Sequence, residues 1–160
     1  MIEMDTKAYA IENGLPCFTL SIKWDSETNK KKVIFPANWQ KIREPVIKKT
    51  HNGFALLTGF TFWVLDFDNC FDNLPQNTQY MLWSTCGAIV KTRRGYHFYF
   101  KMCDTSKEFK NGSNIMFGGK KYDGIDVRAL GGCILAPPSQ YNDDMKHGQG
   151  EFKWISGGHY

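Results

Sequence analysis

Three short apolar runs carry charged or imidazole side chains at alternate positions, and they constrain the fold more than any other feature of the chain. They are residues 64–68 (VLDFD), 93–100 (RRGYHFYF) and 124–128 (GIDVR). In a β-strand, successive side chains point to opposite faces of the sheet. Each run therefore predicts a strand with one apolar face and one polar face.

The polar positions of the three runs meet on one face if the strands are neighbours in one sheet. That face would hold three carboxylates, two guanidinium groups, one imidazole and one glycine. The residues are Asp66, Asp68, Asp126, Arg93, Arg128, His97 and Gly95. Hard oxygen ligands suit a divalent metal, and guanidinium groups suit phosphate. The pattern therefore predicts a surface for a metal and a polyphosphate.

Length and composition predict a globular protein. The chain has 160 residues, of which 42% are hydrophobic and 15% aromatic, enough to bury a sizeable core. No apolar run approaches the roughly 20 residues that span a membrane. Acidic residues occur within residues 1–5, where a signal peptide would need positive charge. We expect a soluble, intracellular protein without a membrane partner.

Five cysteines are scattered along the chain without a Cys-x-x-Cys pair. An odd count argues against a disulfide framework, and the wide spacing argues against a zinc site. We expect buried, reduced thiols.

Charge is distributed unevenly around the candidate ligands. The chain has a net charge of +4, residues 61–90 contain three aspartates and no Lys or Arg, and residues 91–128 contain nine basic and four acidic residues. The basic segment is compatible with a nucleic-acid partner, although lysines of this kind also form ordinary solvated surface.

Periodicity and turn signals predict an α+β fold with a mostly antiparallel sheet and flanking helices, arranged in one domain or in two lobes. Helical patterns cover 5–13 and 74–84, residues 37–43 are predicted to form a helical turn, and 104–123 is predicted to be a mobile polar loop with one helical turn. Strand patterns cover 16–24, 54–59, 61–66, 87–92, 96–101, 125–130, 133–136 and 151–155. We expect 54–59 and 61–66 to lie together in the middle of the sheet, and 125–130 and 133–136 to form a hairpin at Gly131-Gly132.

Asp66 and Asp68 are separated by one apolar residue at the end of a predicted buried strand. Their carboxylates would lie about 6–7 Å apart along the strand. Asp126 would complete a site for two divalent metals, of the kind that activates an attacking oxygen and stabilises a leaving one. An aspartate-rich turn that ends the strand is the alternative interpretation.

The segment around His97 predicts phosphate contacts. Arg93 and His97 could each bond a phosphate oxygen, and Gly95 would leave room for a phosphate to approach the backbone. Arg128 could pair with Asp126 or reach a phosphate. Lys91 and Arg94 lie on the other face or in the turn, which favours contact with a nucleic-acid backbone. The alternative interpretation is that both are solvated turn residues.

Together these segments resemble the archaeo-eukaryotic primase superfamily, in particular its bifunctional primase–polymerase (Prim-Pol) domains. The likeness covers about residues 12–140. It rests on Phe62–Asp68, Gly95-Tyr96-His97 and Ile125–Arg128 in that order, followed by Gly131-Gly132 and Ala136–Ser139, with Gly14–Pro16 and Gly53–Gly59 upstream.

The resemblance implies a primase–polymerase catalytic core with an RRM-like lobe over residues 1–160, or a piece of a longer primase–helicase protein. It implies that Asp66, Asp68 and Asp126 bind catalytic Mg²⁺ or Mn²⁺, that His97 contacts the triphosphate, and that Arg93 takes the place of a basic phosphate-binding residue. Gly95 departs from the family's usual serine. The implied partners are single-stranded DNA template, a primer strand, nucleoside triphosphates and a helicase fused or in trans, at a site of cytoplasmic, viral or plasmid replication.

Two other functions stay open from the sequence. One is a non-catalytic module that binds single-stranded nucleic acid by stacking bases on the aromatic residues of 96–100. The other is a metal-dependent nuclease, since three aspartates and two metals also serve phosphodiester hydrolysis. A nuclease would not need the histidine and arginine phosphate contacts.

Overall fold

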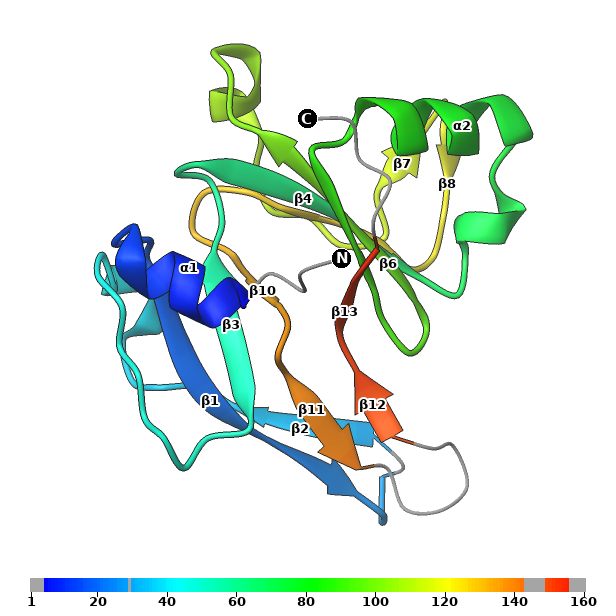
Figure 1. Ribbon diagram of the computed structural model, residues 1–160. Helices are drawn as coiled ribbons and strands as arrows, with labels where there is room; N and C mark the ends of the chain where they lie inside the picture. Colours follow the sequence, from blue (N-terminus) through cyan, green and yellow to red (C-terminus); the bar gives the residue numbers. More distant parts are fainter. Residues whose placement is uncertain (1–4, 29, 143–148, 156–160) are drawn as a thin grey trace. The chain divides into compact units, whose positions relative to one another are not determined.

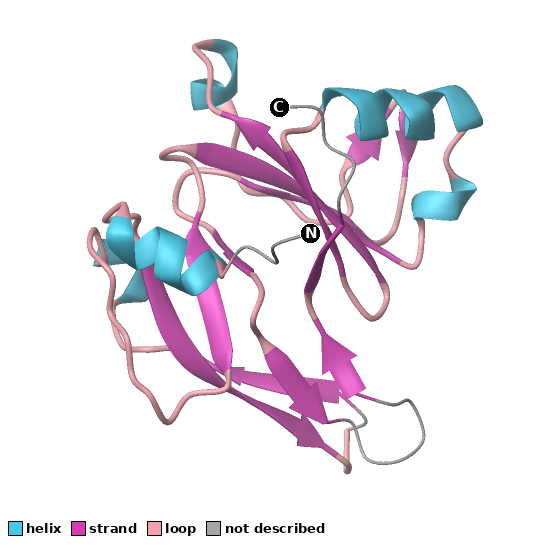
Figure 2. Cartoon of the chain, viewed as in Figure 1, coloured by secondary structure: helices cyan, strands magenta, loops and turns pink. Residues whose placement is uncertain are grey.

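The computed structural model describes residues 5–28, 30–142 and 149–155, and it divides into two compact units (Figure 1). Residues 1–56 and 135–153 form unit 1, and residues 57–134 and 154–160 form unit 2. Strands dominate both units, as Figure 2 shows, with one α-helix of the described residues in each. No helix within the described ranges is long and apolar enough to cross a membrane.

Unit 1 contains most of a four-stranded sheet. Its elements are α1 (Thr6–Glu12), β1 (Cys17–Asp25), β2 (Lys30–Ile34), a 3₁₀ turn η1 (Trp39–Lys41), β3 (Gly53–Leu57), β11 (Gln140–Asn142) and β12 (Gln149–Glu151). The sheet has the order β10-β3-β1-β2, with β10 being Cys133–Leu135, and β11 pairs with β12. Asp5 caps α1 by accepting a hydrogen bond from the Ala8 N–H at 3.0 Å. Gly14, with φ of +62°, follows the end of this helix.

Unit 2 contains a five-stranded sheet with the order β13-β5-β6-β4-β9. Its elements are β4 (Phe62–Asp68), η2 (Phe71–Asn73), α2 (Gln76–Thr85), β5 (Ala88–Lys91), β6 (Gly95–Lys101), η3 (Thr105–Glu108), β7 (Met116–Phe117), β8 (Lys120–Lys121), β9 (Ile125–Arg128) and β13 (Lys153–Ile155). The pairs β4–β6, β4–β9 and β5–β6 are antiparallel. Strand β4 is therefore central, with β6 on one side and β9 on the other.

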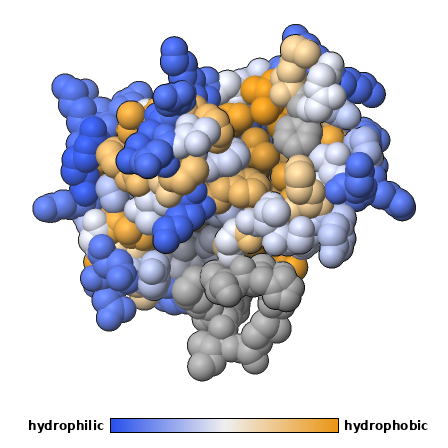
Figure 3. All heavy atoms as spheres, turned by 90° about the horizontal axis from the view of Figure 1, so that it is seen from above, coloured by the Kyte–Doolittle hydropathy of each residue, from blue (hydrophilic) through white to orange (hydrophobic). Residues whose placement is uncertain are grey.

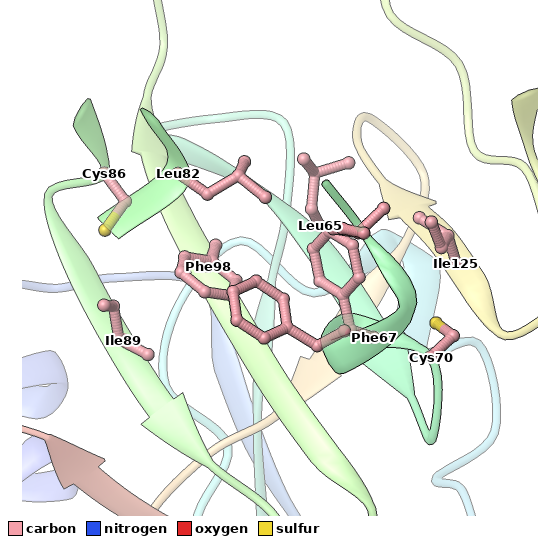
Figure 4. Packing of buried hydrophobic residues seen from close by; sticks show 10 residues of the cluster. Leu65, Phe67, Cys70, Leu82, Cys86, Ile89, Phe98 and Ile125 are labelled. Atoms are coloured by element: carbon pink, nitrogen blue, oxygen red, sulfur yellow. The ribbon is translucent and has the colours of Figure 1, made fainter. Parts of the chain in front are cut away.

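One face of this sheet packs into an apolar core (Figure 4). Leu65 and Phe67 of β4 and Phe98 of β6 contact Leu82 of α2 and Ile125 of β9 within one buried cluster. Aromatic rings supply much of this packing, and the rings of Phe71 and Phe98 stack at 5.1 Å between centroids. The apolar positions of the strand pattern therefore position β4, β6 and β9 side by side.

The predicted α+β fold with a mostly antiparallel sheet is confirmed, as are the helices within 5–13 and 74–84 and the β5–β6 hairpin; residues 37–43 contain only the 3₁₀ turn η1. Two predicted pairings are wrong. Strands β3 and β4 lie in different sheets, and so do β9 and β10. At Gly59 (φ +87°) and Gly131 (φ +84°) the chain leaves one sheet for the other, and a side chain at Gly59 would clash with the Leu130 backbone. Glycine turns mark both reversals, but they do not specify which strand pairs with which.

The cysteines are all free, and Cys17, Cys70 and Cys86 are buried, as predicted. Cys103 is exposed, contrary to the expectation of burial. Polar residues cover much of the face that Figure 3 shows, with hydrophobic residues between them. Tyr80 of α2 is the most exposed large hydrophobic residue within the described ranges, at 76%.

Candidate functional site

The strand register places the three aspartates on one face of the five-stranded sheet. Asp66 of β4 lies opposite Asp126 of β9 and opposite His97 of β6. Residues directly opposite each other in an antiparallel pair point to the same face, with Cβ atoms about 4.5–5.5 Å apart. Asp68, two residues further along β4, shares this face. Leu65 and Phe67 point the other way, into the core.

We call the face that carries Asp66, Asp68, His97 and Asp126 the acidic face. Asp66 and His97 occupy its middle. The His97 Nε2 atom lies 3.4 Å from Asp66 Oδ1, and the side chains are 5% and 17% exposed, respectively. Tyr99 follows His97 on the same face and is also buried. Burial raises the pKa of the Tyr99 hydroxyl, and the negative charge of Asp66 raises it further. Tyr99 therefore remains a neutral phenol beside the carboxylate.

Asp126 is held through both of its oxygens. Its Oδ2 accepts a hydrogen bond from the Arg128 guanidinium at 2.7 Å, and its Oδ1 accepts one from the Asn114 backbone N–H at 3.0 Å. The sequence left open whether Arg128 pairs with this aspartate or reaches a phosphate. The structure contains the ion pair, with side chains 32% and 22% exposed for Arg128 and Asp126.

Asp68 is paired with Arg94, whose guanidinium lies 2.9 Å from Asp68 Oδ2. Arg94 lies in the turn between β5 and β6, and its carbonyl oxygen accepts a hydrogen bond from the Asn69 N–H at 2.7 Å. The sequence placed Arg94 on the other face or in the turn and favoured a nucleic-acid backbone as its partner. The structure has Arg94 in the turn and beside Asp68, because the turn of the hairpin lies next to the end of β4; contact with nucleic acid stays a prediction.

The packing of β6 against β4 requires a glycine at position 95. A side chain at this position would clash with the carbonyl oxygen of Phe67 on β4. The Gly95 N–H donates to Thr92 Oγ1 at 3.0 Å, and the Gly95 carbonyl accepts from the Thr92 N–H at 3.0 Å. The missing side chain thus lets strand β4 approach closely, and the approach of a phosphate to the Gly95 backbone stays a prediction.

Lys91 and Arg93 lie at and just after the end of β5. Strand β5 ends at Lys91 and β6 begins at Gly95, so Arg93 lies in the turn between them, where its side chain is half-buried. Strand alternation does not fix the direction of a turn residue, so the position of Arg93 beside His97 stays a prediction. The Lys91 Nζ atom lies 4.1 Å from the centre of the Tyr96 ring. Tyr96 packs against the core cluster, so Lys91 lies on the opposite face from Asp66, as predicted.

Part of the segment 104–123, which was predicted to be a polar loop, holds strand β9 in place. Val127 exchanges two backbone hydrogen bonds with Gly112, at 3.1 and 2.8 Å, and the Ile115 N–H donates to the Ile125 carbonyl at 2.9 Å. We call residues 110–115 the strap. Asn111 Oδ1 in the strap accepts from the Ala129 N–H at 2.7 Å.

Asn114 is the strap residue that contacts the acidic face. It adopts a left-handed backbone conformation, with φ of +51°. Its side-chain oxygen accepts a hydrogen bond from the Gly124 N–H at 2.8 Å, while its own N–H holds Asp126. Asparagine tolerates this conformation better than most residues. An asparagine in a glycine-rich segment just before the third motif was the one available signal, and it was missed.

The donor set fits a hard divalent cation such as Mg²⁺ or Mn²⁺. The three side chains offer carboxylate oxygens, and each is partly exposed to solvent, at 17%, 40% and 22% for Asp66, Asp68 and Asp126. Burial raises the pKa of the nearby Cys70 thiol, and the charges of all three carboxylates raise it further. As arranged here, with arginines on Asp68 and Asp126, the described residues contain no group of three ligands close enough to hold a metal ion. Ligation of a metal ion by all three carboxylates would require these side chains to turn toward one another.

Comparison with known proteins gives one finding. The family model for the N-terminal domain of bifunctional DNA primase/polymerase (Prim-Pol) matches residues 8–158. No curated protein and no solved structure matches the chain. The family match spans nearly the whole sequence and runs through the three strands of the acidic face, so the chain belongs to the Prim-Pol family of bifunctional DNA primase/polymerase domains.

Proposed function

We propose that this protein catalyses template-directed nucleotidyl transfer, as a primase, a DNA polymerase or both, with divalent metals as cofactors. The observation that supports this most is the direct cross-strand pairing of Asp66 with Asp126, with Asp68 next on the same face, in a chain of the Prim-Pol family. Such a face gathers negative charge where a metal–nucleotide complex would neutralise it.

We further propose that residues 1–160 act as one catalytic domain, with the five-stranded sheet of unit 2 as the RRM-like lobe of a primase–polymerase core. The family match includes parts of both units. The candidate ligands all belong to unit 2, on adjacent strands of its sheet.

In this proposal Asp66, Asp68 and Asp126 hold Mg²⁺ or Mn²⁺. When bound, these ions would activate the primer's 3′-hydroxyl for attack on the α-phosphate and stabilise the leaving pyrophosphate. The strands β4 and β9 fix the spacing of the carboxylates, because their backbones are paired on both sides of Asp66. The chain thus contributes positioning and charge rather than a covalent intermediate.

The cationic side chains around the carboxylates would bind phosphate. Arg128 and Arg94 already lie at the acidic face, and Arg93 is half-buried in the neighbouring turn. His97 lies beside Asp66, where it would reach the triphosphate at the metal. Lys91, on the other face, would contact the template or primer strand through its phosphates.

The test is a nucleotide-incorporation assay with single-stranded DNA template, labelled nucleoside triphosphates and Mg²⁺ or Mn²⁺, with and without a primer. We expect extended or newly made strands that disappear when EDTA is added. Products without a primer would identify a primase, and products only with one would identify an extending polymerase.

Two outcomes of this assay would overturn the proposal. Shortened template without nucleotide incorporation would identify a nuclease that uses the same carboxylates. Tight binding of the single strand that EDTA does not change, without incorporation, would identify a non-catalytic binding module. Asp126→Asn is the matched control, because it removes one negative charge at nearly constant volume.

A further inference from the structure

We propose that Arg128 is an exchangeable counter-ion of Asp126: it covers the metal-binding oxygen until a nucleoside triphosphate draws the guanidinium away. Metal and nucleotide then bind cooperatively through this one side chain. The inference rests on the proposed function, and it concerns the order in which the same site fills.

The two oxygens of Asp126 are held in different ways. Oδ1 accepts from the backbone N–H of Asn114 at 3.0 Å. That N–H is fixed, because the Asn114 side chain binds the Gly124 N–H and the strap is hydrogen-bonded to β9 at Val127. Among the described residues, the hydrogen-bond partner of Oδ2 is a side chain, the Arg128 guanidinium at 2.7 Å. Oδ2 is therefore the oxygen that can change partners without moving the backbone.

Arg128 has the freedom to make this exchange. Its side chain is 32% exposed, and it lies opposite Val64 on the same face as Asp66 and Asp126. Within the described part of the chain, the pair with Asp126 is its one ion pair. An arginine on such an edge can rotate about its long side chain while its Cα stays in β9.

A guanidinium and a divalent cation compete for the same carboxylate oxygen. Each stabilises the negative charge of the carboxylate, and the two positive charges repel each other when both lie next to the same oxygen. A triphosphate offers the guanidinium another partner, because arginine binds phosphate oxygens in a bidentate manner. Arg128 would then leave Oδ2, which becomes available for metal ligation.

This competition makes a specific thermodynamic prediction. Removing Arg128 should strengthen metal binding in the absence of nucleotide and weaken nucleotide binding in the absence of metal. A purely structural role for the ion pair predicts the opposite for the metal, since loss of the pair would loosen Asp126. By linkage, nucleotide should raise metal affinity in the native chain more than in the variant.

The experiment compares the native chain with Arg128→Gln and with Lys107→Ala. Lys107 pairs with Asp104 on η3 at 2.8 Å, with side chains 67% and 99% exposed, so its substitution removes one positive charge outside the acidic face. Free Mn²⁺ is measured by electron paramagnetic resonance without nucleotide, and binding of dATP is measured by calorimetry in EDTA. We expect Arg128→Gln to bind Mn²⁺ about five- to tenfold more tightly and dATP several-fold more weakly. Lys107→Ala should match the native chain in both.

Unchanged or weaker Mn²⁺ binding by folded Arg128→Gln would overturn the inference. The same substitution made in Asp126→Asn should have no effect on Mn²⁺, since the shared oxygen is then absent; an equal gain there would also overturn it. If Arg128→Gln does not fold, Arg128→Lys replaces it, with a smaller gain expected because lysine keeps the charge without the planar fork. Failure of the native chain to incorporate nucleotide would instead reject the proposed function.

Discussion

The two faces of the five-stranded sheet use the same strands for opposite purposes. On one face, alternate residues of β4, β6 and β9 enter an apolar cluster that includes Phe67, Phe98 and Ile125. On the other face, the residues between them place Asp66, His97 and Asp126 opposite one another. Packing on the first face fixes the strands, so like charges on the second face can be held close without a covalent link.

The difference shows where stability and activity are separated in this fold. Burial of apolar surface stabilises the core face, while the carboxylates of the acidic face repel one another and are balanced by Arg94 and Arg128. Substitutions on the acidic face should therefore affect mainly activity, and substitutions on the core face should affect mainly the free energy of unfolding. Four predictions test this contrast.

Asp66→Asn should give the largest effect, a loss of nucleotide incorporation of roughly a thousandfold or more, because it removes a charge from the centre of the proposed metal site. The free energy of unfolding should change by less than about 1 kcal/mol, since the side chain is not part of the core. Incorporation rates and urea unfolding check the two parts. Retained activity in this variant would break the assignment of the acidic face.

Phe98→Ala should destabilise the protein by about 3–5 kcal/mol, because it leaves a cavity among the aromatic rings that pack on Phe98. Phe98 has no exposed surface and packs against Phe71 and Trp83 at 5.1 and 5.6 Å between ring centroids. Urea unfolding measures the change. Tyr80→Ala, at an exposed helix position, is the control and should change stability by less than about 0.5 kcal/mol.

Gly95→Ala should destabilise the protein by about 1–3 kcal/mol, because β4 must shift to relieve a clash with the Phe67 carbonyl. The shift also moves Asp68, so this variant should lose both stability and activity and thus links the two faces. Gly87→Ala is the control, because a side chain there meets only the Tyr99 carbonyl at 3.7 Å. A stable, fully active Gly95→Ala would contradict the close approach of β4 and β6.

His97→Ala should mainly raise the nucleotide KM, by about tenfold, if the imidazole bonds a phosphate oxygen. Steady-state kinetics at saturating Mn²⁺ separate KM from kcat. An unchanged KM with an increased Mn²⁺ requirement would remove His97 from the phosphate contacts and assign it to positioning Asp66, 3.4 Å away.

Strand periodicity predicted the local elements of this fold well, because alternation of apolar and polar residues is a property of each strand. It predicted β4, β6 and β9 and the common face of Asp66, Asp68 and Asp126. It failed for strand partners. Strand β3 is buried at all five positions, so its sequence does not distinguish one sheet from another, and the glycine turns at 59 and 131 allow either connection.

The candidate site was predictable where it lies on strands and unpredictable where it lies on turns. Arg94 was assigned to another role because alternation stops at the end of a strand, and only the folded hairpin brings it to Asp68. Asn114 was missed because its contribution to Asp126 is a backbone N–H, which any residue carries. Its left-handed conformation, rather than its chemistry, distinguishes the position.

The strap over β9 has a consequence for how the protein behaves at high concentration. Strand β9 ends the sheet, and an uncovered edge strand is a template on which a second molecule can add. The strap's hydrogen bonds to Val127 and Ile125 use the outward backbone groups of β9, and Lys110 carries a charge at the same edge. The strand that bears Asp126 is thereby shielded from edge-to-edge aggregation, while the Asp126 side chain keeps 22% of its surface exposed.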